Sequence, residues 1–205
     1  STRRQRVIGY VVWSPPIALN TKPHGSTNYF CVIKLDNARF LPNFKGNVID
    51  LGIHSNWFVS KMYHAQPGFE YPAERLLELK DILTEDHMRH PNMQDPAGEQ
   101  CLYVIKRGLT SLTTIGRASG LLSFAREYFP NQTHRDSIEW AILPYDLESL
   151  PFSEKGDSGA MVACITGEFG GLITGGTGRR QSADITYATP MFSLWPIIKA
   201  RFPRA

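Results

Sequence analysis

The residues best suited to chemistry lie in the stretch 155–160, which reads Lys-Gly-Asp-Ser-Gly-Ala. Glycines flanking Asp157 and Ser158 permit backbone conformations closed to other residues and let the chain approach a bound group closely. Ser158 could then present a nucleophilic hydroxyl, with the backbone N–H groups of Gly156 and Ser158 forming an oxyanion hole. Asp157 is the predicted buried support of the turn. A surface turn with a capping serine fits the same residues, so the tetrapeptide alone leaves both interpretations open.

Three segments after Ser158 follow one another in an order that resembles one enzyme family. Gly170–Gly176 resembles the strand and substrate-binding rim after the nucleophile, Ile185–Pro190 the last strand, and Leu194–Lys199 the start of the C-terminal helix. With Gly-Asp-Ser-Gly, these segments resemble the trypsin-like (chymotrypsin-fold) serine peptidases, and the whole chain from Val7 onward is most similar to uncharacterised fungal members. The resemblance implies peptide-bond cleavage through a Ser158 acyl-enzyme.

The same resemblance implies an all-β fold, a chymotrypsin-like double β-barrel of which this chain resembles the C-terminal part. Residues 1–62 are expected to form the closing part of an incomplete first barrel, and residues 63–99 a helical insertion and linker. Residues 100–205 are expected to form the second barrel, with the nucleophile loop and a C-terminal helix. Apolar residues at helical spacing and an early proline predict the inserted helix over Tyr71–Leu83.

The general base that would activate Ser158 has no clear counterpart among the six histidines. None lies in the strand-end context that the family uses, and His54 is the least unsuitable of them. We therefore expect the base to come from outside this chain, on an N-terminal fragment of the same precursor or on another subunit. A barrel that lacks its first strands exposes unpaired edges, which require such a partner.

The carboxylate that would orient the base also has no counterpart at the family's position for it. By the family's layout its position is occupied by Tyr29, preceded by Asn28, and neither carries the required negative charge. Loss of that carboxylate slows acyl transfer by about four orders of magnitude in a well-studied triad. A catalytically weak or inactive peptidase-fold binding protein is therefore the alternative function, and a β protein unrelated to peptidases is a third.

The family's substrate pocket, carried over by position, places Phe152 at the base and Ile185 at the wall. Thr174, Gly175 and Gly176 would form the rim. Because this set contains no carboxylate that could bind lysine or arginine, the pocket is expected to accept small or aliphatic side chains of a peptide or protein substrate.

Composition narrows the remaining possibilities. A net charge of +3 over 205 residues is too small to predict a nucleic-acid partner, and no apolar run is long enough to predict a membrane span. No cofactor and no metal site are predicted. Cys31 and Cys164 lie in strand-like apolar runs, which predicts buried free thiols and weakly favours an intracellular, reducing compartment.

Overall fold

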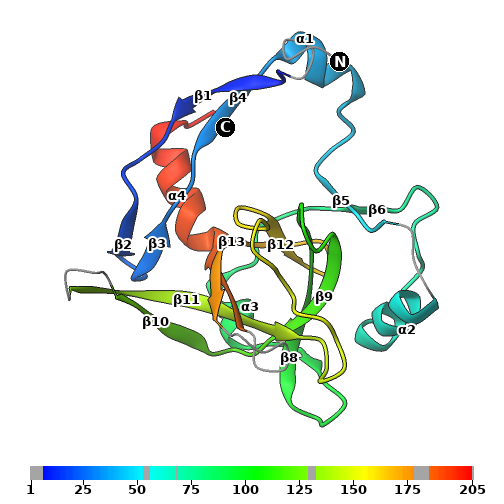
Figure 1. Ribbon diagram of the computed structural model, residues 1–205. Helices are drawn as coiled ribbons and strands as arrows, with labels where there is room; N and C mark the ends of the chain where they lie inside the picture. Colours follow the sequence, from blue (N-terminus) through cyan, green and yellow to red (C-terminus); the bar gives the residue numbers. More distant parts are fainter. Residues whose placement is uncertain (1–6, 53–55, 68, 129–132, 178–184, 205) are drawn as a thin grey trace.

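A closed β-barrel occupies the C-terminal half of the chain in the computed structural model, which describes residues 7–52, 56–67, 69–128, 133–177 and 185–204 (Figure 1). The barrel strands are β8 (Gln100–Arg107), β9 (Thr113–Ala118), β11 (His134–Pro144), β12 (Met161–Cys164), β13 (Phe169–Thr177) and β14 (Ile185–Pro190). Antiparallel pairing runs in the order β8–β9–β11–β14–β13–β12 and returns to β8. The predicted all-β fold with a closed barrel is thus confirmed.

Two short additions extend this barrel. Strand β10 (Leu122–Tyr128) pairs with β11 as a hairpin that projects from the barrel, and β7 (Met93–Gln94) pairs with β8. The helix α4 (Met191–Arg201) follows β14 directly, as predicted for the C-terminal helix.

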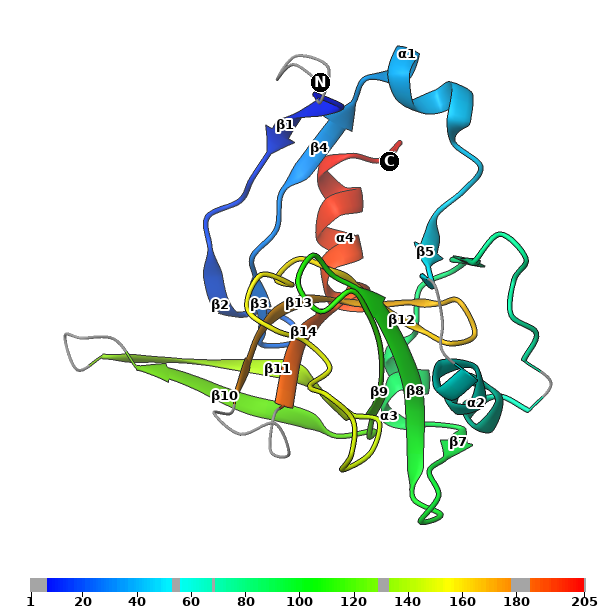
Figure 2. The same cartoon turned by 45° about the vertical axis from the view of Figure 1, so that its right-hand side comes forward.

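Strand β8 is buried on both faces because it separates two hydrophobic clusters. Its side chains alternate, so Leu102 and Val104 enter the cluster inside the barrel, while Tyr103 and Ile105 enter a second cluster outside it. Helix α2 (Asn56–Ala65) covers the outer cluster with Phe58 and other apolar residues one and two turns along the same face (Figure 2). This double burial explains why residues 101–105 form a continuous apolar run.

The described residues before the barrel form separate two-stranded sheets instead of a second closed barrel. The pairs are β1 (Gly9–Trp13) with β4 (Val32–Leu35), β2 (Ala18–Thr21) with β3 (Ser26–Asn28), and β5 (Val48–Asp50) with β6 (Leu76–Glu78). A short helix α1 (Asn37–Phe40) and the 3-10 helix η2 (Leu41–Asn43) connect β4 toward β5. The β1–β4 ribbon lies beside α4 in both Figure 1 and Figure 2, and the rings of Trp13 and Phe202 lie 5.9 Å apart.

The prediction of a helix over Tyr71–Leu83 is wrong. That segment contains strand β6 and then docks in extended form against residues 167–169, through hydrogen bonds such as Lys80 N–H to the Gly167 carbonyl and Leu83 N–H to the Phe169 carbonyl. Arg75 and Asp81 have positive φ angles, which interrupt a helix. The apolar residues of this segment divide between the two clusters, with Leu79 against the outer one and Leu83 in the barrel. Helices α2 and α3 (Glu85–Arg89) lie on either side of this segment in the sequence.

The prediction for the cysteines holds for one of the two thiols. Cys164 is buried in the barrel, as is Cys101 in the outer cluster. Cys31, in contrast, is exposed and precedes β4, whose own residues are at most half-buried.

Candidate active site

The loop that carries Ser158 connects β11 to β12 and is fixed to β13 by its backbone. Gly159 N–H donates to the Ile173 carbonyl at 2.7 Å, and Ile173 N–H donates to the Ala160 carbonyl at 3.0 Å. Gly156 has φ +110°, and a side chain there would also approach the Thr110 hydroxyl within 2.4 Å. Glycine is therefore required at 156 by both conformation and space.

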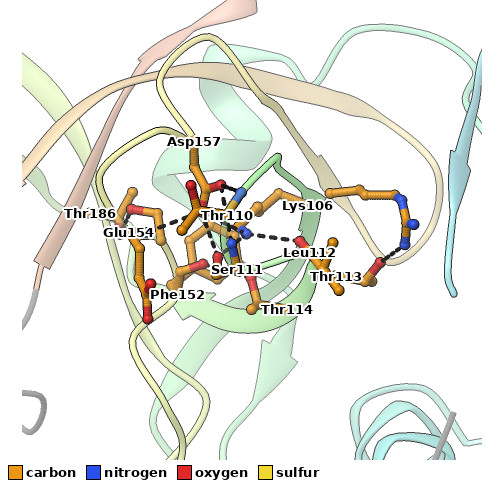
Figure 3. Close-up of polar contacts among 12 residues, drawn as sticks. Lys106, Thr110, Ser111, Leu112, Thr113, Thr114, Phe152, Glu154, Asp157 and Thr186 are labelled. Atoms are coloured by element: carbon orange, nitrogen blue, oxygen red, sulfur yellow. Dashed lines mark hydrogen bonds and ion pairs between the residues drawn. The ribbon is translucent and has the colours of Figure 1, made fainter. Parts of the chain in front are cut away.

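Asp157 and Ser158 face opposite environments. Asp157 is 1% exposed, whereas the neighbouring Ser158 is exposed. The Asp157 carboxylate accepts hydrogen bonds from the backbone N–H groups of Thr110 at 2.8 Å and Glu154 at 3.0 Å, and from the hydroxyl of Ser111 (Figure 3). The carboxylate thereby connects its own loop to the β8–β9 turn, and holds the loop so that the next residue points outward.

A buried cation completes this network. Lys106 follows Leu102 and Val104 on the inner face of β8, and its Nζ lies 3.1 Å from Asp157 Oδ2 with both side chains fully buried. The ammonium donates to the carbonyl of Leu112, to Ser111 Oγ and to Asp157 (Figure 3). Since a lysine ammonium has three hydrogens, these three acceptors satisfy it completely. Lys106 is thus a structural cation and is not placed to act as a base.

The pKa of Asp157 reflects these contacts. Burial alone would raise the pKa, but the hydrogen bonds from Ser111, Glu154, Thr110 and Lys106 outweigh it and hold the pKa of this carboxyl well below its ordinary value. Desolvation lowers the pKa of Lys106, and the bond to Asp157 opposes that shift. The favourable geometry of the pair supports an ionised Asp157 next to a protonated Lys106.

The two backbone N–H groups and the hydroxyl that were predicted to act on a substrate form no hydrogen bonds within the described residues. In the part of the chain that the structure describes, neither Gly156 N–H nor Ser158 N–H donates a hydrogen bond, and the Ser158 hydroxyl has no partner. Two amide donors and one hydroxyl on an exposed loop are the groups that an oxyanion hole and a nucleophile need, and a general base would have to be added to them. Lys106, Ser111 and Thr110 were not predicted as part of this site, although a lysine that continues the inward-facing positions 102 and 104 was a visible signal.

The residues predicted for the substrate pocket divide into two groups. Thr174, Gly175 and Gly176 line a cavity of about 460 Å³ together with Tyr29, which follows β3. Phe152 is instead buried in the barrel core against Gly116, and its carbonyl accepts a hydrogen bond from Thr114. Neither Phe152 nor the half-buried Ile185 is among the described residues that line this cavity.

No described histidine contacts Ser158. His24, His87 and His90 face Glu85, Glu168 and Asp86 at distances of 3.6, 3.2 and 3.1 Å. The remaining described histidines are His134, near Asp136, and His64, which lines a different cavity next to Lys61. His54 lies outside the described residues. Tyr29, at the position expected for the orienting acid, is 56% exposed.

Among the described residues, no group of three or more histidine, cysteine, aspartate or glutamate side chains could hold a metal ion. None of the helices in the described ranges combines the length and the apolarity that a membrane crossing requires.

Comparison with known proteins gives a partial likeness. No protein-family model matches this chain, and no curated protein matches it. A crystal structure of a Cellulomonas bogoriensis chymotrypsin matches 49% of this chain at 21% identity, with a TM-score of 0.33. The match spans 46% of that protein. The fold is therefore assigned from the barrel's own strand order.

Proposed function

We propose that this chain carries the nucleophile of a serine endopeptidase. The supporting observation is the exposed Ser158, held next to a fully buried Asp157–Lys106 pair on a loop with two uncommitted amide donors. In the proposed reaction the Ser158 Oγ attacks a peptide carbonyl, and the N–H groups of Gly156 and Ser158 stabilise the oxyanion. An imidazole base takes the hydroxyl proton and then transfers it to the leaving amine, and water hydrolyses the acyl-enzyme.

The base in this proposal comes from a polypeptide that pairs with the β1–β4 ribbon, either an N-terminal fragment of the same precursor or another subunit. In the described chain this ribbon pairs with no further strand, and it exposes Tyr10, Val11 and Ile33. Unpaired edges with exposed apolar side chains favour the addition of a strand. Native mass spectrometry of the protein from its source tests this: a bound histidine-containing polypeptide supports it, and a bare, active chain contradicts it.

A second function, a peptidase-fold binding protein without catalysis, is favoured by Tyr29 at the acid position and by the histidines that face other carboxylates. A fluorophosphonate probe distinguishes the two functions. Stoichiometric labelling of the native assembly, absent in the Ser158→Ala variant and retained in a Ser149→Ala variant, supports the peptidase. An unlabelled, folded assembly supports the binding protein.

The preference for small or aliphatic side chains next to the scissile bond is retained as part of the proposal. It rests on the absence of a carboxylate among the predicted pocket residues, and on Phe152 filling the space beside Gly116. Cleavage of a peptide series with alanine, valine, phenylalanine and lysine at that position tests it.

A further inference from the structure

A cavity of about 460 Å³ lies between the N-terminal segment and the barrel. Its walls come from β2, from residues 27–29, and from strands β10, β11, β13 and β14. Gly175 faces open space, since a Cβ atom there would have no neighbour within 4 Å. The absence of a side chain at this position keeps the cavity open from the β13 side.

Glu139 is the carboxylate that lines this cavity, and it is only 2% exposed. One carboxylate oxygen accepts a hydrogen bond from the hydroxyl of Thr27, and the other accepts one from Thr189 at 3.1 Å. No lysine, arginine or histidine among the described residues forms an ion pair with it. A buried carboxylate bonded only to neutral hydroxyls lacks a counter-charge, and a cation that reaches it gains a strong interaction.

The one described cation beside the cavity is already paired. Arg126 lines the cavity, but its guanidinium makes two hydrogen bonds to Asp136, at 2.7 and 3.1 Å. Across the β10–β11 ladder, Arg126 lies opposite Asp136, and Ser123 lies opposite Glu139. The positions of the two pairs along each strand therefore differ by an odd number of residues. Because successive side chains alternate, the arginine pair projects from the opposite face of the hairpin to Glu139.

The cavity lies along a free strand edge that leads away from Ser158. Strand β13 is bonded to the nucleophile loop at Ile173, and among the described strands residues 174–177 pair with β14 alone. An extended peptide can add to the open edge. If it runs antiparallel to β13, its residue opposite Thr174 lies near Ser158, and residues farther toward its N-terminus lie opposite 175–177, at about 3.3 Å per residue.

We propose that Glu139 recognises a lysine or arginine side chain of the substrate, two to four residues N-terminal to the scissile bond. The aliphatic stem of that side chain would contact Ile17 and Leu19, and its cationic end would bind the carboxylate. This inference rests on the proposed function for the direction of the peptide. It adds a basic requirement at a position separate from the small or aliphatic residue at the bond itself.

Binding of labelled peptides to the Ser158→Ala protein tests the proposal without turnover. The probes are fluorescein-labelled hexapeptides in which lysine, or uncharged norleucine of similar shape, is placed in turn at each of these positions. Fluorescence anisotropy should give binding about tenfold to a hundredfold tighter for lysine at one position. Glu139→Gln should remove this difference, while Glu148→Gln, at an exposed acidic residue, should keep it.

Each outcome separates the two proposals. Equal binding of lysine and norleucine peptides overturns the role of Glu139 and leaves the peptidase proposal standing. Absence of peptide binding, with fluorophosphonate labelling of Ser158 retained in the unsubstituted protein, also overturns the role of Glu139 and leaves the peptidase proposal standing. Absence of both overturns both proposals. The comparison of lysine with norleucine needs no change at Glu139, so it is decisive even where Glu139→Gln fails to fold.

Discussion

Replacing Lys106 by methionine gives the most direct test of how the nucleophile loop is held. Lys106 is 0% exposed and lies 3.1 Å from Asp157, so the substitution leaves a buried carboxylate without its counter-charge. Ser111, Thr110 and Glu154 would continue to donate to Asp157, but none of them supplies a positive charge. Removal of one partner from a buried pair costs about 3–5 kcal/mol. Lys106→Met should therefore lower the free energy of unfolding by that amount.

Urea unfolding followed by tryptophan fluorescence measures this loss, and Lys80→Met provides the matched control. Lys80 undergoes the same chemical change, but it is largely exposed and pairs with Glu78 at the surface. Exposed pairs contribute little to stability, so the control should unfold at the same urea concentration as the unsubstituted protein. Fluorophosphonate labelling of Ser158 in folded Lys106→Met should also slow, because the loop loses an anchor.

A loss below about 1 kcal/mol for Lys106→Met, or a loss equal to that of Lys80→Met, would refute the reasoning. Such a result would mean that the neutral donors alone hold Asp157, and that the buried cation is incidental to the loop.

Three further predictions concern the same region. Gly108→Ala should destabilise the protein by about 2 kcal/mol or more, because its Cβ would lie 2.2 Å from Asp157 Oδ1; Gly175→Ala, in open space, should leave the unfolding midpoint unchanged. Because the pKa of folded Asp157 is lowered from 3.8, its contribution to stability is complete above about pH 4 and is lost as the pH falls below that value, so urea midpoints should decline there, and less so in Asp157→Asn. Phe152→Ala should cost about 3–5 kcal/mol by calorimetry, because Phe152 is buried in the barrel; Phe44→Ala, at an exposed residue, is the control.

Sequence patterns predicted those parts of the fold that depend on local signals. The segments Gly170–Gly176, Ile185–Pro190 and Leu194–Lys199, expected as two strands and a helix, lie in β13, β14 and α4. Glycines around Asp157 and Ser158 correctly predicted a turn with a buried carboxylate. These features follow from burial and backbone conformation within a few residues.

Long-range contacts explain what the sequence did not predict. Tyr71–Leu83 has helical spacing only because its apolar residues divide between two separate clusters, a partition visible only after folding. Lys106 and Asp157 are 51 residues apart, and Thr27 and Glu139 are 112 apart, so no local pattern connects either pair. Cys31 was expected inside because the sequence around it resembles a core strand, whereas it precedes a strand of a two-stranded ribbon and is exposed.

The double burial of β8 has one more consequence, which concerns errors of strand alignment. A slip of one residue would turn Tyr103 and Ile105 into the barrel and Leu102 and Val104 out of it. It would also exchange Lys106 for Arg107 at the inner end, where the longer guanidinium would meet the space shaped for an ammonium. Packing on both sides therefore disfavours a shifted alignment of this strand. The correct alignment also places Lys106 beside Asp157 of the serine loop.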